Sequence, residues 1–398
     1  MIRKAFAMVL CLSLLLAGCG SAEPENTDIL PETENASAQD AQTVPAASAM
    51  TGKTVDLTKD TRDDRDLTKE ITVKGPADWT CHTYRFTLMD DMPEAEIRSI
   101  LLPDDHSRAE MKEPEPSGCP VLEKGSGKRI YNRNHWISLE AADTGEKDKY
   151  VMITELLQFK HREDPGAKPL DLEFMSAQDA ENRMKDILNA FHMPLIPQLS
   201  YIAGMDHAQL MDYQAYLFQH DKTYDPFGDR VEMTDLDADY DAYYMEFYFT
   251  LDGIPVFQSP DFGWYSQGGP EEVPLEICKA EILLTRKGIQ QFTLQAGIQK
   301  AEPIEKKPLV DPETAAKNML LQIEQCPSWP GTYQLDAMQL NLVPVFRFGD
   351  QTGTMVPLWC SNLHAENFEG QWTDCTDSPW NFFLDPYTGG QAFESLQK

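Results

Sequence analysis

The sequence lacks most of the short motifs that mark common catalytic sites. It contains no C-x-x-C pair, no H-E-x-x-H segment, no G-x-S-x-G turn and no glycine-rich phosphate loop. These absences argue against thioredoxin-type redox sites, helical zinc proteases, nucleophile-elbow hydrolases and P-loop nucleotide-binding proteins. The eight histidines are scattered without metal-ligand spacing. We therefore predict no catalytic residue, no enzyme activity and no cofactor.

Basic residues are also scarce. The 398 residues include 34 Lys and Arg against 65 Asp and Glu, a formal net charge of −31. So acidic a surface repels phosphate backbones, which excludes nucleic acid as an expected partner. It attracts cations and cationic polypeptides instead.

Long apolar runs are limited to the start of the chain. Two basic residues precede an apolar stretch over residues 5–17, which is too short to cross a bilayer and is typical of a signal peptide. Residues 16–19, Leu-Ala-Gly-Cys, resemble the bacterial lipobox. The resemblance implies a signal peptide over residues 1–18, lipidation of Cys19 and anchoring on the extracytoplasmic face of the cell membrane. The alternative is a secretory signal with a chance cysteine.

The segment after Cys19 is predicted to be an acidic, disordered tether over residues 19–68. Residues 20–50 are rich in Ser, Ala, Glu, Thr and Pro and contain no aromatic residue, so they cannot bury enough apolar surface to fold. A flexible chain of about fifty residues, the length of the whole tether, has an r.m.s. end-to-end distance of roughly 40 Å. Cleavage before Cys19 removes two basic residues and leaves 65 acids against 32 bases, a charge of −33.

Six cysteines remain in the predicted mature chain after the lipid-bearing one. An even number outside the cytoplasm permits disulfides, but free thiols are equally consistent with the sequence. These cysteines are Cys81, Cys119, Cys278, Cys326, Cys360 and Cys375.

The rest of the chain predicts an α+β fold with antiparallel sheets, each packed by one or two helices. In a first domain, over 69–170, residues 84–88 alternate as a strand and Pro93 opens a helix. Two strands are expected next, near 135–141 and 150–159.

Two further units, over 171–302 and 303–398, each begin with a helix and continue with strands. Ser176 and Asp179 form a helix-capping pattern, and Asp311 precedes a proline at the start of the second helix. A strand follows over 243–251, where alternate side chains are apolar. Prolines in three strands indicate edges or bulges. We interpret the two units as a degenerate repeat, with coincidence as the alternative.

The final residues carry a family resemblance. The Ser- and Asp-capped helices, followed by strands that end in Phe-Leu-Asp-x-x-Thr-Gly over 383–389, resemble the PepSY-type module. The layout is similar to YycH/YycI-like extracytoplasmic regulators, and the whole chain resembles uncharacterised clostridial-type lipoproteins. The resemblance implies regulation of a partner protein in the envelope and transfers no catalytic residue.

One acidic loop has the spacing of a calcium site. Asp235, Asp237, Asp239 and Asp241 alternate, and Glu246 stands at the twelfth place, as in the EF-hand loop. However, position 240 holds a tyrosine where that loop needs glycine. We therefore expect a solvated acidic loop, with a calcium site as the alternative.

The leading hypothesis is a non-enzymatic, membrane-tethered interaction or regulatory module with an envelope protein as its partner. A solute-binding lipoprotein is the alternative, followed by an envelope hydrolase. Several aromatic residues offer a possible sugar-stacking platform, although packing in the core is the expected role of such side chains. They are Trp264, Tyr265, Trp329, Trp359, Trp372 and Trp380.

Overall fold

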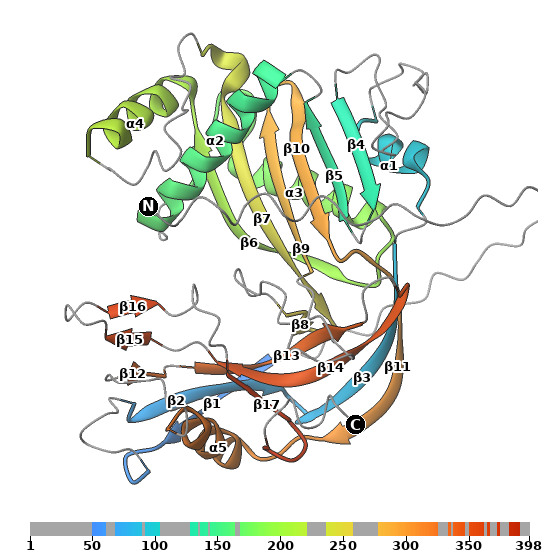
Figure 1. Cartoon of the computed structure of the whole chain (residues 1–398), viewed down its shortest axis with the longest axis vertical. Coiled ribbons are helices and arrows are strands. Elements are labelled where there is room, and N and C mark those ends of the chain that lie inside the picture. Colours follow the sequence, from blue (N-terminus) through green and yellow to red (C-terminus); the bar gives the residue numbers. More distant parts are fainter. Residues whose placement is uncertain are drawn as a thin grey trace, which may run out of the picture. The chain divides into compact units, whose positions relative to one another are not determined.

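The computed structural model describes residues 50–60, 68–89, 92–103, 128–133, 136–141, 144–163, 168–220, 236–257, 278–324, 333–335, 337–346, 350–361, 364–366, 372–374 and 382–390. These residues belong to one compact unit that spans residues 45–398. They form two largely antiparallel sheets, a small third sheet and five α-helices (Figure 1), which confirms the predicted α+β class. Within these ranges, no helix is long and apolar enough to cross a membrane.

The first large sheet, termed the β1 sheet, contains strands from both ends of the described chain. Its strands are β1 (Met50–Asp56), β2 (Glu70–Pro76), β3 (Thr80–Leu88), β11 (Ile298–Pro308), β13 (Ala337–Val345), β14 (Thr352–Ser361) and β17 (Phe382–Leu384). They are ordered β1-β2-β13-β14-β3-β11, with β17 paired to β14. Helix α5 (Pro312–Glu324) packs against β1, β2 and β17. The small sheet is formed by β12 (Tyr333–Gln334), β15 (His364–Glu366) and β16 (Trp372–Asp374).

The second large sheet, termed the β7 sheet, is built from the middle of the chain. Its strands are β4 (Lys128–Arg133), β5 (Trp136–Ala141), β6 (Ile196–Met205), β7 (Ala242–Leu251), β8 (Ile254–Pro255), β9 (Lys279–Thr285) and β10 (Gly288–Gln295). They are ordered β4-β5-β10-β9-β7-β6, with β8 paired to β7. Helix α1 (Glu94–Leu101) lies near β4.

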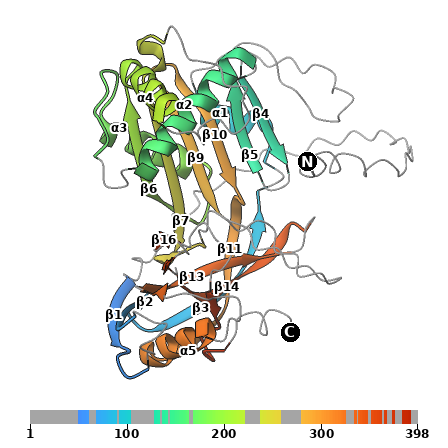
Figure 2. The same cartoon turned by 60° about the vertical axis from the view of Figure 1, so that its left-hand side comes forward.

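Helices cover both faces of the β7 sheet (Figures 1 and 2). Helix α3 (Ala177–Ala190) packs on one face, where the alternating residues Tyr243, Met245 and Phe247 of β7 are fully buried. Helices α2 (Thr144–Glu163) and α4 (His207–His220) pack on the other face, over Tyr244 of β7 and Leu283 of β9. Alternation along a strand sends successive side chains to opposite faces, so both faces of β7 are apolar and both are covered.

Two predicted helix starts are confirmed at the level of individual hydrogen bonds. Ser176 Oγ accepts the backbone N–H of Asp179 at 3.1 Å and donates to the Asp179 carboxylate at 2.7 Å. In α5, Asp311 Oδ1 accepts the backbone N–H of Thr314 at 2.9 Å. Each bond satisfies an N–H group that has no partner within its helix.

The predicted strand at 150–159 is wrong, because this segment lies in helix α2. The buried residues Tyr150, Ile153, Leu156 and Leu157 follow the spacing of three and four of a helix. Val151, which a strand would have directed inward, is 38% exposed. The alternating pattern therefore coincided by chance with part of a helical stripe.

The predicted tether extends too far, because residues 50–56 form β1. This strand pairs with β2 along its whole length, and Val55 and Leu57 are buried. Within the predicted first domain, β2 and β3 belong to the β1 sheet, whereas β4 and β5 belong to the β7 sheet. Strand β11 also runs across the predicted boundary at residue 302.

Two strand prolines lie in inner strands rather than edge strands. Pro344 in β13 lies beyond the short segment that pairs with β2, and Pro357 in β14 lies between the segments that pair with β3 and β17. Among the described residues, each proline therefore has a ladder partner on one side only. This arrangement tolerates the missing N–H.

Candidate functional site

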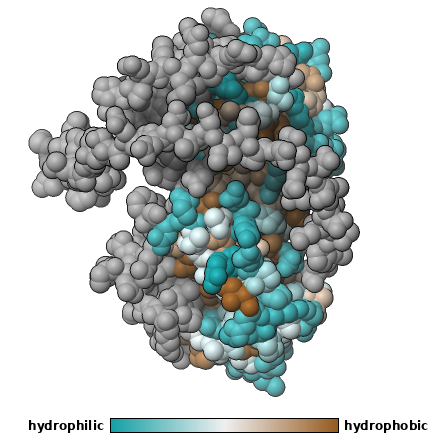
Figure 3. All heavy atoms as spheres, turned by 90° about the vertical axis from the view of Figure 1, so that its right-hand side faces the viewer, coloured by the Kyte–Doolittle hydropathy of each residue, from teal (hydrophilic) through white to brown (hydrophobic). Residues whose placement is uncertain are grey.

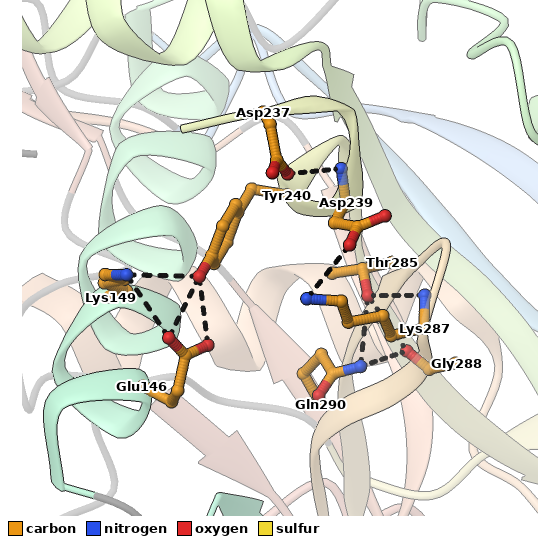
Figure 4. Close-up of polar contacts among 9 residues, drawn as sticks. All are labelled: Glu146, Lys149, Asp237, Asp239, Tyr240, Thr285, Lys287, Gly288 and Gln290. Atoms are coloured by element: carbon orange, nitrogen blue, oxygen red, sulfur yellow. Dashed lines mark hydrogen bonds and ion pairs between the residues drawn. The ribbon is translucent and has the colours of Figure 1, made fainter. Parts of the chain in front are cut away.

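The acidic segment that resembles a calcium loop forms a short 3₁₀ turn, η1 (Ala238–Tyr240). Asp237 Oδ1 accepts the backbone N–H of Asp239 at 2.9 Å and so caps this turn (Figure 4). Asp235 lies outside the described residues. The turn leads directly into β7. As a result, Asp239, Tyr240 and Asp241 lie beside the β9–β10 turn, α2 and α4, respectively.

Tyr240 is the centre of a polar network that we term the Tyr240 network, together with Glu146, Lys149, Asp239 and Lys287. Its ring is buried at 7% exposure, and its hydroxyl lies 2.9 and 3.1 Å from the two Glu146 oxygens and 3.1 Å from Lys149 Nζ (Figure 4). A phenol has a single hydrogen, so it donates to Glu146 and accepts from Lys149. The ammonium groups of Lys149 and Lys287 lie 5.0 and 5.3 Å from the ring centroid, within the range of a cation–π contact.

The two lysines of this network are stabilised as cations. The hydrogen bond with Tyr240 and the contact with Glu146 raise the pKa of Lys149. Partial burial opposes the protonated form of Lys287, but its 3.1 Å ion pair with Asp239 prevails and raises its pKa. Each ammonium group is therefore paired with a carboxylate.

The β9–β10 turn holds Lys287 in place through its own hydrogen bonds. Thr285 Oγ1 accepts from the backbone N–H of Lys287 and from Gln290 Nε2, each at 3.1 Å. Gln290 Nε2 also donates to Gly288 O, and Gly288 adopts φ +92°, which suits glycine. These bonds close the turn at Arg286, Lys287 and Gly288 between β9 and β10.

Asp241 fixes the start of α4. Its buried carboxylate accepts the backbone N–H of His207 at 2.8 Å and lies 2.7 Å from the Nδ1 of the same histidine. Because an ionised carboxylate can only accept, Nδ1 carries a hydrogen and donates it to Asp241.

The described residues of the candidate calcium loop do not converge on one point. Asp239 pairs with Lys287, and Asp241 pairs with His207. Glu246 lies along β7 and accepts the Tyr244 hydroxyl at 2.7 Å. No group of three or more potential metal ligands occurs within the described part of the chain. The loop therefore connects η1 to its neighbours through separate pairs.

Helix α4 carries three exposed rings, Tyr216, Phe218 and His220, and a partly buried one, Tyr213, that packs against the core. Its buried side contains Leu210, Gln214 and Leu217, whereas Tyr216 is 48% and Phe218 is 41% exposed. Tyr216 stacks between Tyr213 and His220, with ring centroids 6.1 and 4.5 Å apart. We term these four rings, Tyr213, Tyr216, Phe218 and His220, the α4 aromatic surface. On the face drawn in Figure 3, by contrast, hydrophilic residues cover much of the coloured surface.

The described cysteines are free thiols in the core. Burial raises the pKa of Cys81 to about 12 and raises the pKa values of Cys278 and Cys360 as well. A thiol, rather than the nucleophilic thiolate, is therefore their form at neutral pH. Cys19 and the other three predicted mature-chain cysteines lie outside the described residues.

The aromatic residues considered for sugar stacking are only partly described. Trp359 is fully buried and packs on Trp79, with ring centroids 5.6 Å apart, so it offers no exposed platform. The side chains of the other five lie outside the described part.

Comparison with known proteins supports the fold alone. No protein-family model and no curated protein matches this chain. The chain is similar to an uncharacterized protein from Eubacterium rectale ATCC 33656 of known crystal structure, with a TM-score of 0.53 and 12% sequence identity. The match covers 83% of this chain and 91% of that chain.

Sequence reasoning identified Asp237, Asp239 and Asp241 but missed their partners. Asp241 lies 34 residues from its partner His207. Tyr240, which lies between these aspartates, is 91 residues from its partner Lys149. No local spacing signals such contacts, because they depend on how strands and helices pack.

Proposed function

We propose that this protein is a membrane-tethered extracytoplasmic lipoprotein that acts as a non-enzymatic interaction or regulatory module. The lipobox-like residues 16–19 support the anchor. The PepSY-like ending supports the regulatory role. Its Asp-Pro-Tyr-Thr-Gly turn contacts α5, where Asn318 Nδ2 donates to Gly389 O at 3.0 Å.

The observation that carries the interaction role is the α4 aromatic surface. The charged groups of the Tyr240 network neutralise one another, which suits a structural connection better than catalysis. The side chains of Tyr216 and Phe218 are 48% and 41% exposed, which is a large exposure for aromatic residues on a helix of a very acidic protein. Exposed aromatic residues are enriched at the centres of protein interfaces, where tyrosine is a frequent energetic hot spot.

The anchor is tested with Cys19→Ala in cells. We expect wild-type protein to fractionate with membranes and the variant to lose both lipid and membrane association, because a single thiol carries the acyl chains. Processing at the same position, together with retention in the membrane fraction, would refute the lipoprotein assignment.

The interaction is tested by photo-cross-linking in native membranes. We expect a discrete cross-linked complex with wild-type protein and at least about tenfold less of it with a Tyr216→Ser/Phe218→Ser variant, since hot-spot residues contribute 2 kcal/mol or more. Leu321→Ser is the matched control, because Leu321 is 50% exposed but lies on α5. Equal loss with the control, or no complex with wild-type protein, would contradict the proposal.

A further inference from the structure

Strand β1 is an unusually regular edge of its sheet. All seven residues pair with β2 without a register shift. Among the described residues, β1 pairs with no other strand. An outer strand leaves half of its N–H and C=O groups directed away from the sheet, and these groups can accept an added strand.

In the two large sheets, the other strands at the ends of the strand order carry features that oppose such pairing. Strand β11 contains Pro303 and Pro308 and has two register shifts, and β6 contains Pro197 and one shift. Beside β4, the Asn132 side chain donates to Met92 O at 2.8 Å, so that strand is tied to the segment before α1. Prolines, bulges and covering segments are the usual protections of sheet edges. Strand β1 has neither a proline nor a bulge.

The side chains of β1 indicate what kind of strand would fit. Gly52 and Thr54 are exposed and small, so they allow close approach of another backbone. At the end of the strand, Asp56 lies directly opposite Glu70 of β2, and both are exposed. Like charges directly opposite each other on a sheet are unfavourable. A basic residue added beside Asp56 would be attracted by both carboxylates.

The charge state of this end of the strand is stable at neutral pH. Thr58 donates to Asp56 Oδ1 through both its hydroxyl and its backbone N–H, at 2.5 and 2.8 Å, and these bonds lower the pKa of Asp56. At the other end, Lys74 lies opposite Gly52, and Lys53 Nζ lies 4.3 Å from the centroid of the Trp79 ring. An incoming segment should therefore be basic at one end only.

We propose that β1 binds an extended segment of a basic polypeptide as an added strand, with a Lys or Arg beside Asp56 and an uncharged residue beside Gly52. This inference rests on the proposed interaction function and gives its partner a chemical class. A second copy of this chain fits less well, because each copy carries a net charge of −31 and the two would repel each other.

The test uses the full lipid-anchored chain, purified in detergent, and a synthetic probe. The probe is an eight-residue, end-capped peptide of alternating Thr and Val with two lysines at one end. We expect saturable binding by fluorescence anisotropy and slowed amide hydrogen exchange in β1. Methylation of alternate peptide nitrogens preserves charge but removes ladder hydrogen bonds, and should weaken binding at least about tenfold. Equal binding of the methylated peptide would overturn the proposal.

Charge recognition is tested with Asp56→Asn and a matched variant on the opposite edge, Glu302→Gln in β11. A cross-strand pair of opposite charges contributes 0.2–1 kcal/mol, so Asp56→Asn should weaken binding about 1.4- to fivefold. Glu302→Gln should leave it unchanged. Equal effects of the two variants, or a concentration-dependent dimer that protects β1 without peptide, would overturn the choice of partner.

This experiment is independent of the cross-linking test. The Tyr216→Ser/Phe218→Ser variant should bind the peptide normally, because its changes lie on α4. If this variant loses the cross-link but still binds the peptide, the partner contacts α4 as well as β1. If the wild-type protein does not bind the peptide, the β1 proposal is wrong and the proposed interaction function is unaffected.

Discussion

Replacing Tyr240 with phenylalanine removes one oxygen atom and tests whether the Tyr240 network stabilises the fold. The ring and both cation–π contacts remain, while the bonds to Glu146 and Lys149 disappear. A hydrogen bond to a charged group contributes about 1.5–3 kcal/mol. Because the Glu146 and Lys149 side chains are 38% and 37% exposed, water replaces part of that contribution, and we expect a loss of about 1 kcal/mol.

The assay is urea unfolding of the variant beside a matched control, Tyr216→Phe, which removes the same atom from a ring that is 48% exposed. Substitutions of that kind usually change the free energy of unfolding by less than about 0.5 kcal/mol. A double-mutant cycle with Glu146→Gln then isolates the contact, and we expect a coupling of about 0.5–1 kcal/mol. If Tyr240→Phe is as stable as the control, or if the two changes in the cycle simply add, the network does not stabilise η1.

Three further predictions concern other parts of the fold. Gly389→Ala should lower the free energy of unfolding by about 1–3 kcal/mol, because this residue has φ +71° and an added Cβ would lie 2.5 Å from Asn318 Nδ2; urea unfolding measures the loss. The three buried thiols should resist iodoacetamide in the folded protein and react once urea unfolds it, as peptide mass spectrometry would show; rapid labelling without urea would contradict their burial. The hydrogen bonds from Lys306 and Thr80 lower the pKa of Asp78 to about 2. The ionised Asp78 carboxylate therefore stabilises the fold fully above about pH 4, and this stabilisation disappears as the pH falls towards 2. In Asp78→Asn the urea midpoint of unfolding should depend less on pH in this range.

Features set by neighbouring residues were accessible from the sequence. The caps at Ser176 and Asp311 use hydrogen bonds between residues three apart, and the β9–β10 turn is closed by hydrogen bonds within residues 285–290. The alternation along β7 also predicted correctly which side chains share a face. In each case the chain segment itself contains all the groups that determine its conformation.

Features that depend on distant partners were not accessible. The apolar residues of α2 matched a strand as well as a helix, and only packing against the β7 sheet selects the helical set with Ile153 and Leu156. In the same way, β1 exists because β2 offers it a ladder and because Val55 is buried in the core. Composition alone described this segment as part of the tether.

The acidity of the chain and the order of its contacts lead to one conclusion about recognition. In the Tyr240 network each lysine is paired with one carboxylate, so the network has no net charge. The net negative charge of the chain, which has 65 acidic and 34 basic residues, therefore lies elsewhere. A diffuse negative charge accelerates the approach of any basic partner but does not distinguish one from another. Discrimination requires charge at a defined position beside unsatisfied backbone groups, and Asp56 opposite Glu70 on the edge of β1 combines the two.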